Sequence, residues 1–505
     1  MSNPLFDTVF GQHRTKHQPF LEMLDGSTVT LEEYLQLASQ YANLFSRLGV
    51  QTGDRVAVQI EKSLQSLAVY AACIQAGIVF LPLNTAYTSD EVSYFLSDSG
   101  ARLMLCDEKR IDALNSIAKS CEATLETMNA DGGGSFTDKA QTMPKTFDTV
   151  DRNLDDLTAL LYTSGTTGRS KGAMLTQGNL LSNCQTLVSE WKFDADDVLI
   201  HALPIFHTHG LFVATNIALI SGCKILFFPK FDLDSIILSI PKASCMMGVP
   251  TFYTRLLGDE RFTRKLTQHM RLFISGSAPL LAETHVQFEE RTGHRILERY
   301  GMTETNMITS NPYEGERRAG TVGFPLRDVE LKITDSETGK SLPQGEIGAI
   351  EVRGPNVFMG YWQMPEKTAE ELRKNGFFIT GDLGKIDEEG YLHIVGRNKD
   401  LIISGGYNIY PKEIEMLLDD EIGVLESAVV GVPHPDFGET VLGVLVPEPQ
   451  ATLDCAAIKQ SIGKSLARFK QPQELVIVAE LPRNSMGKVQ KKELRDTFKD
   501  VFKPA

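Results

Sequence analysis

The chain has 505 residues, which is too long for a single hydrophobic core and predicts two or three domains. Hydrophobic residues make up 42% and charged residues 23%, as in ordinary soluble globular proteins. The formal net charge of −15 argues against a general binder of nucleic acids or anionic membranes, so any anionic substrate must be bound by local Lys and Arg.

The seven cysteines are scattered without CxxC spacing, and most lie in apolar surroundings. This usage predicts reduced core residues rather than a disulfide framework or a zinc site. The first twenty residues contain no signal-peptide hydrophobic segment, and no apolar run reaches membrane-spanning length. We therefore expect a cytoplasmic protein, although a short organellar address is compatible with the sequence.

Helix and strand patterns alternate in the first part of the chain. Helical spacing of apolar residues occurs over 31–48, 64–76 and 91–97. Short apolar runs predict strands at 55–59, 78–83 and 103–106. Ser63 and Gly77 suit the two ends of the second helix, and Thr88 with Glu91 forms a capping box for the third. The alternation predicts an α/β fold with doubly wound parallel sheets.

A polar, Gly- and Thr-rich stretch follows over 120–150 and predicts a loop or linker. The apolar run 157–162 then predicts a buried strand that leads into TSGTTGRSKG, residues 163–172. Glycine lets backbone N–H groups turn toward an anion, the hydroxyls add donors, and Lys171 adds a positive charge. This stretch is therefore suited to a polyphosphate.

The same stretch does not have the spacing of a Walker A loop. That motif has four residues between its glycines, followed by Lys and Ser or Thr. Here two residues separate Gly165 from Gly168, and Lys171 is followed by Gly172. The alternative to a phosphate site is an ordinary surface turn between two strands.

Further motifs also follow apolar runs. After a helix with Thr176 as its N-cap, strand patterns occupy 198–206, 224–228, 243–249, 271–275 and 295–300. The first of these leads into HTHG, the fourth into GSAPL and the last into GMTETN. Because open α/β sheets bind ligands at the carboxyl ends of their strands, we expect these motifs to surround the phosphate-binding stretch.

The arrangement of predicted helices and strands changes after about residue 396. Pro411 starts a short helix, and strand patterns and a further helix follow at 426–430, 441–447, 456–468 and 476–479. A glycine turn over 484–488 leads into a basic final helix. This predicts a small α+β domain, and we place the two domains at 1–397 and 398–505.

Seven stretches together resemble the adenylate-forming superfamily of acyl- and aryl-CoA synthetases, stand-alone adenylation domains and beetle luciferases. They are YTSGTTGRSKG, LPIFHTHG, SGSAPL, RYGMTETN, TGDLG, GRNKDLIISGGYNIYP and PRNSMGKVQKKEL. The resemblance covers nearly the whole chain and implies a large N-terminal domain of several sheets with a small, mobile C-terminal lid. It also implies that a carboxylate and ATP form an acyl-AMP and pyrophosphate, after which CoA forms a thioester and AMP is lost.

The resemblance implies which residues bind the nucleotide. The β- and γ-phosphates are assigned to Thr163, Ser164, Gly165, Thr166, Thr167 and Lys171. The adenine pocket and the adjoining nucleotide contacts are assigned to Ser277, Ala278, Pro279, Glu298, Arg299, Tyr300, Gly301 and Met302. The ribose hydroxyls are assigned to Asp382 and Arg397. Taken singly, Tyr300 would suit a core position, and Asp382 and Arg397 would suit loop ion pairs.

The metal and the lid carry the remaining implied roles. Thr303 would contact the α-phosphate, and Glu304 with Thr167 would hold Mg²⁺, although a lone Glu is more commonly an exposed loop carboxylate. Lys488 resembles the lysine that bridges the substrate carboxylate and the α-phosphate during adenylation. Lys399 lies at the position of the family's hinge, with an ordinary linker as the alternative. Rotation there would bring Gly405 and Gly406 toward the pantetheine of CoA.

Within the family, the chain most resembles malonyl-CoA synthetases, through LPIFHTHGLF, MGVPTFYTRLL, LFISGSAPLL and ERYGMTETNMITSNP. The second carboxylate of malonate is ionised at neutral pH and cannot be buried unpaired, so its pocket needs a cation. We expect Arg255 to supply it, with His207 and Ser277 in the wall of the pocket. The alternative is that Arg255 is a surface residue of the helix after Pro250.

The predicted function is therefore that of a malonyl-CoA synthetase that uses ATP, Mg²⁺ and CoA, as a monomer or weak homodimer. Methylmalonate, succinate or oxalate is an alternative substrate, since one methyl group changes binding by only about 1–3 kcal/mol. A stand-alone amino-acid adenylation module would need an anion for the substrate ammonium, and we find none at the matching positions. Lys488 and Glu304 argue against a nucleotide-binding protein without catalysis.

Overall fold

The computed structural model describes residues 2–13, 17–163, 170–404, 407–434, 437–484 and 487–502. The chain groups into two compact units, Met1–Glu330 with Val352–Phe378, and Leu331–Glu351 with Ile379–Ala505. The fold is a mixed α/β fold, as predicted. The division at residue 397, which was placed where a lid would rotate, stays a prediction.

One sheet of the first unit contains the strand that leads into the predicted phosphate-binding stretch, in the order β18-β8-β7-β4-β3-β5-β6. Its strands are β3 (Arg55–Gln59), β4 (Val79–Pro82), β5 (Leu103–Cys106), β6 (Thr124–Thr127), β7 (Leu157–Thr163), β8 (Lys171–Thr176) and β18 (Gly360–Tyr361). The neighbouring pairs β3–β4, β3–β5, β5–β6 and β4–β7 are parallel, whereas β8 is antiparallel to both β7 and β18. The parallel centre confirms the doubly wound prediction.

Local sequence determines where the helices around this sheet begin and end. They are α2 (Leu31–Arg47), α3 (Leu64–Ala76), α4 (Ser89–Ser99), α5 (Ile111–Ser120) and α6 (Ser135–Ala140). The Ser63 hydroxyl accepts a hydrogen bond from the first turn of α3, and Gly77 ends that helix with φ +66°. Thr88 and Glu91 form the expected capping box at α4.

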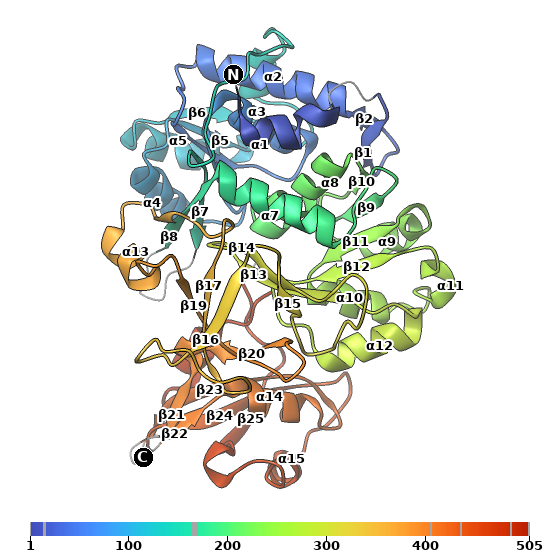
Figure 1. Cartoon of the computed structure of the whole chain (residues 1–505), viewed down its shortest axis with the longest axis vertical. Coiled ribbons are helices and arrows are strands. Elements are labelled where there is room, and N and C mark those ends of the chain that lie inside the picture. Colours follow the sequence, from blue (N-terminus) through green and yellow to red (C-terminus); the bar gives the residue numbers. More distant parts are fainter. Residues whose placement is uncertain are drawn as a thin grey trace. The chain divides into compact units, whose positions relative to one another are not determined.

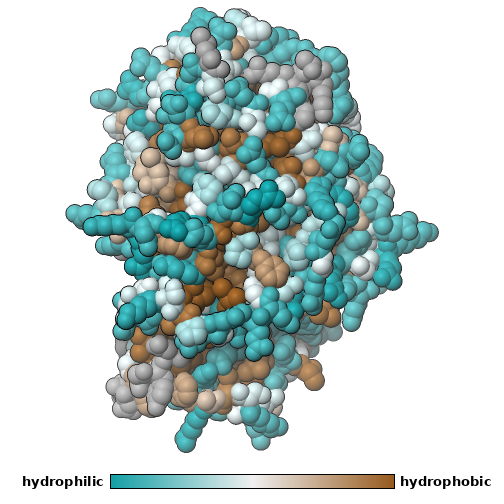
Figure 2. Space-filling model, in the orientation of Figure 1, coloured by the Kyte–Doolittle hydropathy of each residue, from teal (hydrophilic) through white to brown (hydrophobic). Residues whose placement is uncertain are grey.

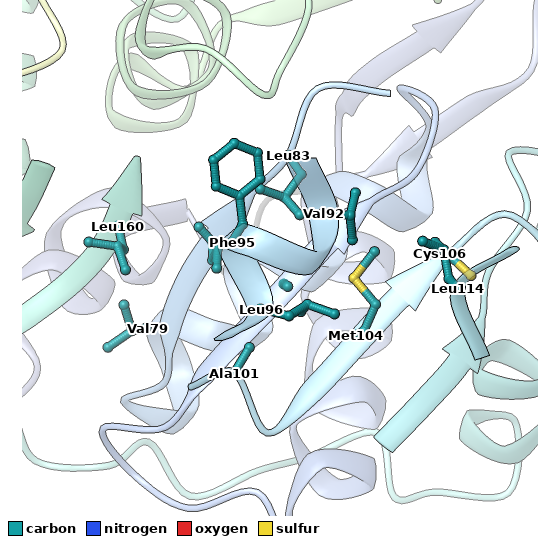
Figure 3. Close-up of a cluster of buried hydrophobic side chains, with 12 residues drawn as sticks. Val79, Leu83, Val92, Phe95, Leu96, Ala101, Met104, Cys106, Leu114 and Leu160 are labelled. Carbon is teal, nitrogen blue, oxygen red and sulfur yellow. The ribbon is translucent and has the colours of Figure 1, made fainter. Parts of the chain in front are cut away.

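The hydrophobic core of this sheet lies between α4 and the strands. Val92, Phe95 and Leu96 of α4 are buried in one cluster with Met104 and Cys106 of β5 (Figure 3). Val92, Phe95 and Leu96 recur at helical spacing, and the β5 residues form a continuous apolar run. The sequence therefore showed both a helix pattern and a strand pattern here.

A second sheet of the first unit has the order β15-β14-β13-β12-β11-β9-β10-β1-β2. Its strands are β1 (Pro19–Met23), β2 (Thr28–Thr30), β9 (Val198–His201), β10 (Lys224–Phe227), β11 (Cys245–Gly248), β12 (Leu272–Ser275), β13 (Leu297–Met302), β14 (Asn306–Ser310) and β15 (Phe324–Pro325). The strands from β1 through β10, β9, β11 and β12 to β13 are parallel neighbours. Their carboxyl ends therefore lie along one edge.

Helix α7 (Gln177–Glu190) lies between the two sheets and contacts β8 of one and β14 of the other (Figure 1). Thr176 caps it, as predicted. The other helices of this unit are α1 (Pro4–Val9), η1 (Gly11–His13), η2 (Glu108–Arg110), the π-helix η3 (His209–Thr215), α8 (Asn216–Ser221), α9 (Leu233–Ser239), η4 (Ile240–Lys242), α10 (Pro250–Leu257), α11 (Arg264–Thr267), α12 (Ala282–Thr292) and α13 (Pro365–Glu371).

The second unit contains two sheets. Most residues of β16 (Glu330–Thr334), β17 (Gly348–Arg353), β19 (Phe378–Ile386) and β20 (Leu392–Arg397) belong to it, in the order β16-β17-β19-β20. The other sheet has the order β22-β21-β24-β23, with β25 beside β24. Its elements are η5 (Asn398–Asp400), β21 (Ile402–Ser404), β22 (Tyr407–Ile409), α14 (Pro411–Asp419), β23 (Val424–His434), β24 (Gly438–Pro447), α15 (Cys455–Ile462), η6 (Arg468–Lys470), β25 (Glu474–Ile477) and α16 (Lys491–Phe498).

Three local predictions are wrong. The stretch 120–150 is not only a loop, because β6 and α6 lie in it and β6 extends the sheet beside β5. The strand predicted over 198–206 ends at His201, where pairing with β10 and β11 stops. The helix predicted over 456–468 ends at Ile462, after which the chain turns through Gly463. In the first two cases strand pairing with distant residues decides the outcome.

The described part of the chain contains no helix that is long and apolar enough to cross a membrane. The seven cysteines are unpaired, and five of them are buried, as expected for core residues. Hydrophilic side chains cover much of the face shown in Figure 2, with apolar residues between them.

Candidate active site

The lysine predicted to bind phosphate lies in a network of charged side chains within the first unit. Lys171, at the start of β8, is 8% exposed, and its Nζ donates to Glu371 Oε1 over 3.1 Å. The same ammonium lies 4.1 Å from the centre of the Tyr361 ring. The Tyr361 hydroxyl is 2.6 Å from Glu371 Oε2 and 3.1 Å from Glu304 Oε1. Lys171 is therefore held in place by an acid and an aromatic face.

Glu304, predicted to hold Mg²⁺, is buried in the turn between β13 and β14, at 5% exposure. Its backbone carbonyl accepts a hydrogen bond of 2.8 Å from the Phe358 N–H, and the Thr163 hydroxyl lies 3.4 Å from Oε1. A buried carboxylate with hydroxyl neighbours fits a hard cation such as Mg²⁺. Thr303 precedes it in the same turn and is half-buried.

The residues of the expected adenine pocket follow β12 and occupy β13. Ser277 has φ +72°, Ala278 is half-buried and Pro279 is exposed. Glu298 is buried and accepts a hydrogen bond of 3.1 Å from the Leu280 N–H. This bond ties the two motifs together.

Three further residues of this set continue along β13. Tyr300, Gly301 and Met302 are half-buried. A Cβ at Gly301 would lie 2.1 Å from the Asn306 carbonyl oxygen, so this position requires glycine. The predicted adenine set is therefore brought together at the ends of β12 and β13.

Arg299, in the same strand β13, has a buried guanidinium group. Its side chain is buried, with 4% exposure, and among the described residues Nε and Nη2 have no hydrogen-bond partner. The guanidinium packs so closely on Gly276 that a Cβ there would lie 2.3 Å from Cζ. Burial lowers the pKa of Arg299 to about 9, which still leaves it protonated at neutral pH. A buried cation with free N–H groups is suited to an anion.

One histidine of the HTHG motif lies next to this cation. His209 is 3% exposed, its Nδ1 lies 3.2 Å from Ser277 Oγ, and burial and the charge of Arg299 hold its pKa well below the usual value. His207 is half-buried, with its ring centre 4.6 Å from that of Phe206. Neutral His209, Ser277 and Arg299 thus form one polar group of side chains, of which the sequence analysis named Ser277 and Arg299 but not His209.

Arg255, the predicted partner of the second carboxylate, is exposed on α10. Its guanidinium lies 5.8 Å from the centre of the Phe231 ring. Tyr253, two residues earlier, is fully buried, and residues two apart on a helix point about 200° apart. The helix therefore turns Arg255 outward, and its substrate role stays a prediction.

The predicted ribose residues pair with each other in the second unit. Asp382 in β19 lies opposite Arg397 in β20, and Arg397 Nε is 2.7 Å from Asp382 Oδ1. The carboxylate is buried, and the Asp382 N–H donates to the Thr380 hydroxyl over 3.1 Å. The pairing matches the ion pair considered from sequence and leaves the ribose role as a prediction.

The lid residues are exposed. Lys399 lies in η5. Lys488 follows Gly487, whose φ is +74°, and its N–H donates to Asn484 Oδ1 over 3.0 Å. The predicted glycine turn is therefore present. Ser164, Gly165, Thr166, Thr167, Gly405 and Gly406 lie outside the described residues.

Residues 11–362 match the AMP-binding enzyme family, and residues 413–488 match the AMP-binding enzyme C-terminal domain. The chain belongs to the AMP-binding enzyme family. This AMP-binding enzyme is 34% identical to a malonate–CoA ligase of Arabidopsis thaliana, over 94% of this chain and 83% of the relative. It is 33% identical to a feruloyl-CoA synthase of an Amycolatopsis species, over 94% of each chain.

Among solved structures, the AMP-binding enzyme is similar to ATP-bound MatB from Rhodopseudomonas palustris. The two chains are 55% identical, each is covered completely, and the TM-score is 0.98. An anthranilate–CoA ligase in complex with anthranoyl-AMP is 25% identical, with a TM-score of 0.90 and coverage of 98% and 97%. The fold and the enzyme class predicted from the motifs are confirmed.

Sequence reasoning missed two groups of this AMP-binding enzyme's site. Glu371 and Tyr361 lie far from the phosphate motif in the chain, and no pattern marks them. Arg299 was assigned to adenine, although the signal for its burial was present, because it lies inside the strand pattern LERY. The exposure of Arg255 matches the alternative considered from sequence, a surface arginine on the helix after Pro250.

Proposed function

We propose that this chain is a malonate–CoA ligase that converts malonate, ATP and CoA to malonyl-CoA, AMP and pyrophosphate through malonyl-AMP. Relatives named malonate–CoA ligases from Arabidopsis thaliana and Mus musculus, 34% and 31% identical, support this reading. Relatives named for ferulate, indoleacetate and long-chain fatty acids are about as similar, so identity alone does not select the acid.

The buried guanidinium of Arg299 is the observation that carries the choice of malonate. An acid with an apolar chain would leave this charge buried against hydrocarbon, which is strongly unfavourable. The second carboxylate of malonate would instead accept hydrogen bonds from Nε and Nη2, the two atoms without partners among the described residues. His209 and Ser277, which lie beside Arg299, would complete a polar pocket of small size.

The reaction would proceed in two steps. A carboxylate oxygen of malonate attacks the α-phosphorus of ATP, an O–P bond forms, and the bond to pyrophosphate breaks. The sulfur of CoA then attacks the acyl carbon, a C–S bond forms, the acyl C–O bond breaks, the thiol proton is released, and AMP leaves.

The side chains of this enzyme would neutralise charge and position the reactants. Lys171 would bind the β- and γ-phosphates. Glu304 would hold Mg²⁺, which supplies further neutralisation of the phosphates. Lys488 would approach the reacting carboxylate in the first step, and Asp382 would accept the ribose hydroxyl protons.

The test is AMP formation that depends on both CoA and a carboxylate, measured with malonate, methylmalonate, succinate, oxalate and propionate. We expect malonate to have the highest kcat/KM and methylmalonate to be the nearest competitor, since one methyl group is worth only about 1–3 kcal/mol. Preference for propionate would contradict the assignment, because that acid lacks the second carboxylate.

A further inference from the structure

A lysine outside the motifs is buried within the first unit. Lys62 follows β3 and is 7% exposed. Its Nζ lies 2.8 Å from the His201 carbonyl oxygen, 2.9 Å from His201 Nδ1 and 4.5 Å from the centre of the Phe227 ring. Among the described residues no carboxylate contacts it. Burial holds its pKa well below the usual value.

The position of Lys62 joins the two sheets of the first unit. The residue follows the carboxyl end of β3 in one sheet, while His201 and Phe227 end β9 and β10 in the other. A methionine or leucine would fill the same space without the cost of burying an amine. The lysine therefore has a role that its hydrogen bonds must supply.

His201 is fully buried, and its ring accepts a hydrogen bond from Lys62 and donates one to Gly210. His201 Nε2 lies 2.8 Å from the Gly210 carbonyl oxygen, which can only accept, so Nε2 carries the ring proton. Nδ1 then carries the lone pair and accepts from Lys62. Lys62 thus selects the tautomer of His201 that donates to Gly210.

Gly210 belongs to the π-helix η3, a rare conformation that needs supporting contacts. Its carbonyl also accepts from the Thr215 hydroxyl over 2.9 Å, and a Cβ at Gly210 would lie 2.0 Å from the Pro204 carbonyl oxygen. The segment 204–210 is consequently held tightly against the end of β9. It carries His207 and, immediately before Gly210, His209, which contacts Ser277.

We propose that Lys62 and His201 are positioning residues that set the specificity of the acyl pocket. They do so by holding the backbone at Gly210, directly after His209. The connection runs from the Lys62 amine through the His201 ring to the Gly210 carbonyl, and from the adjacent His209 to Ser277 beside Arg299. This inference rests on the proposed function, because the pocket it shapes is the one assigned to the short diacid.

The test compares Lys62→Met, which keeps length and apolar volume, with Lys62→Gln, whose amide retains two N–H donors. We expect Lys62→Met to raise the KM for malonate about ten- to a hundred-fold, because small displacements of positioning groups have effects of this size. The KM for ATP and the Tm should change little, and Lys62→Gln should restore part of the loss. Lys224→Met, at the opposite end of β10 where Lys224 pairs with Glu22, is the control and should behave as wild type.

A double-mutant cycle locates the effect. In a His209→Asn background, Lys62→Met should add little further loss if it acts through His209. For Lys62→Met, an unchanged KM for malonate, equal rises in the KM values for malonate and ATP, or an effect on Tm alone would overturn the proposal. So would fully additive effects of Lys62→Met and His209→Asn on the KM for malonate.

Wild-type turnover of the acid panel is measured first. If another acid is preferred, the malonate assignment fails, while the same KM comparison with that acid still decides the role of Lys62.

Discussion

Lys171 Nζ donates to Glu371 Oε1 over 3.1 Å, although the two residues are 200 positions apart in the chain. Counted without the backbone atoms, the two side chains are 11% and 22% exposed, so both are mostly buried. Burial raises the pKa of Glu371, but the hydrogen bond from the Tyr361 hydroxyl and the neighbouring lysines lower it more, so the pKa lies below its usual value and this carboxylate is ionised at neutral pH. The residue expected to bind phosphates therefore has a permanent intramolecular counter-ion.

Glu371→Gln should lower the KM for ATP about two- to fivefold. The amide keeps the shape but removes a negative charge that partly cancels Lys171 and repels a triphosphate, a change worth about 0.5–1 kcal/mol. The measurement is the KM for ATP at saturating malonate and CoA. Glu370→Gln is the matched control, because Glu370 also pairs with Lys367 but not with Lys171. A higher KM in Glu371→Gln would show that the acid orients Lys171 more than it competes with phosphate.

Arg299→Leu and Arg255→Leu separate the two candidates for the second carboxylate. Removing one partner of a buried charged pair costs roughly 3–5 kcal/mol, so Arg299→Leu should lower kcat/KM for malonate about 10²- to 10³-fold. Activity with propionate should hold or rise, because its chain prefers an apolar wall. Arg255→Leu should change neither value by more than about twofold, since exposed charges contribute little.

The readout for these two variants is kcat/KM with both acids on one enzyme preparation. Arg299→Lys keeps the charge but loses the planar fork, and it should lie between wild type and Arg299→Leu. Equal losses with malonate and propionate in Arg299→Leu would assign Arg299 to the nucleotide or to structure. A selective loss of malonate in Arg255→Leu would return the role to Arg255.

Lys488→Ala should abolish malonyl-AMP formation and leave thioester formation from supplied malonyl-AMP largely intact. The exposed lysine after the Gly487 turn carries a single charge that would act only on the reacting carboxylate and α-phosphate. Pyrophosphate release measures the first step, and malonyl-CoA formation measures the second. Lys492→Ala, four residues later, is the control. Comparable losses in both half-reactions would contradict this division.

Asp419→Asn should stabilise the second unit at neutral pH. Burial raises the pKa of Asp419 to about 6, against 3.8 for an ordinary Asp. With a folded-state pKa above the unfolded value, the contribution to stability is complete below about pH 4 and is lost as the pH rises through 6. Asparagine avoids this loss and can still accept the hydrogen bond of 2.7 Å from the Ser427 hydroxyl.

For this variant, the change in Tm relative to wild type is measured at pH 5 and pH 7.5. We expect a gain of about 1–3 kcal/mol in the free energy of unfolding at pH 7.5 and a smaller one at pH 5. Asp420→Asn, at the exposed neighbouring position, should show no such difference. An equal effect of Asp419→Asn at both pH values would mean that the carboxyl does not titrate in this range.

Sequence by itself determined the features that depend on neighbours in the chain. The caps Ser63, Thr88 and Thr176 and the Gly77 and Gly487 turns follow from hydrogen bonds and φ values within a few residues. The ordered motifs predicted the AMP-binding family and the acid–CoA ligase class. They did so because phosphate and carboxylate chemistry needs particular residue types next to particular strand ends.

Only the tertiary structure decided which charged residues are buried together. Lys62 and His201 are 139 positions apart, and Lys171 and Glu371 are 200 apart, so no local pattern relates them. Arg299 is buried because β13 lies between β12 and β14, whereas Arg255 is turned to the surface by the packing of Tyr253. Burial converts an ordinary arginine into a cation that requires an anion, and the burial of a side chain depends on how distant elements pack around it.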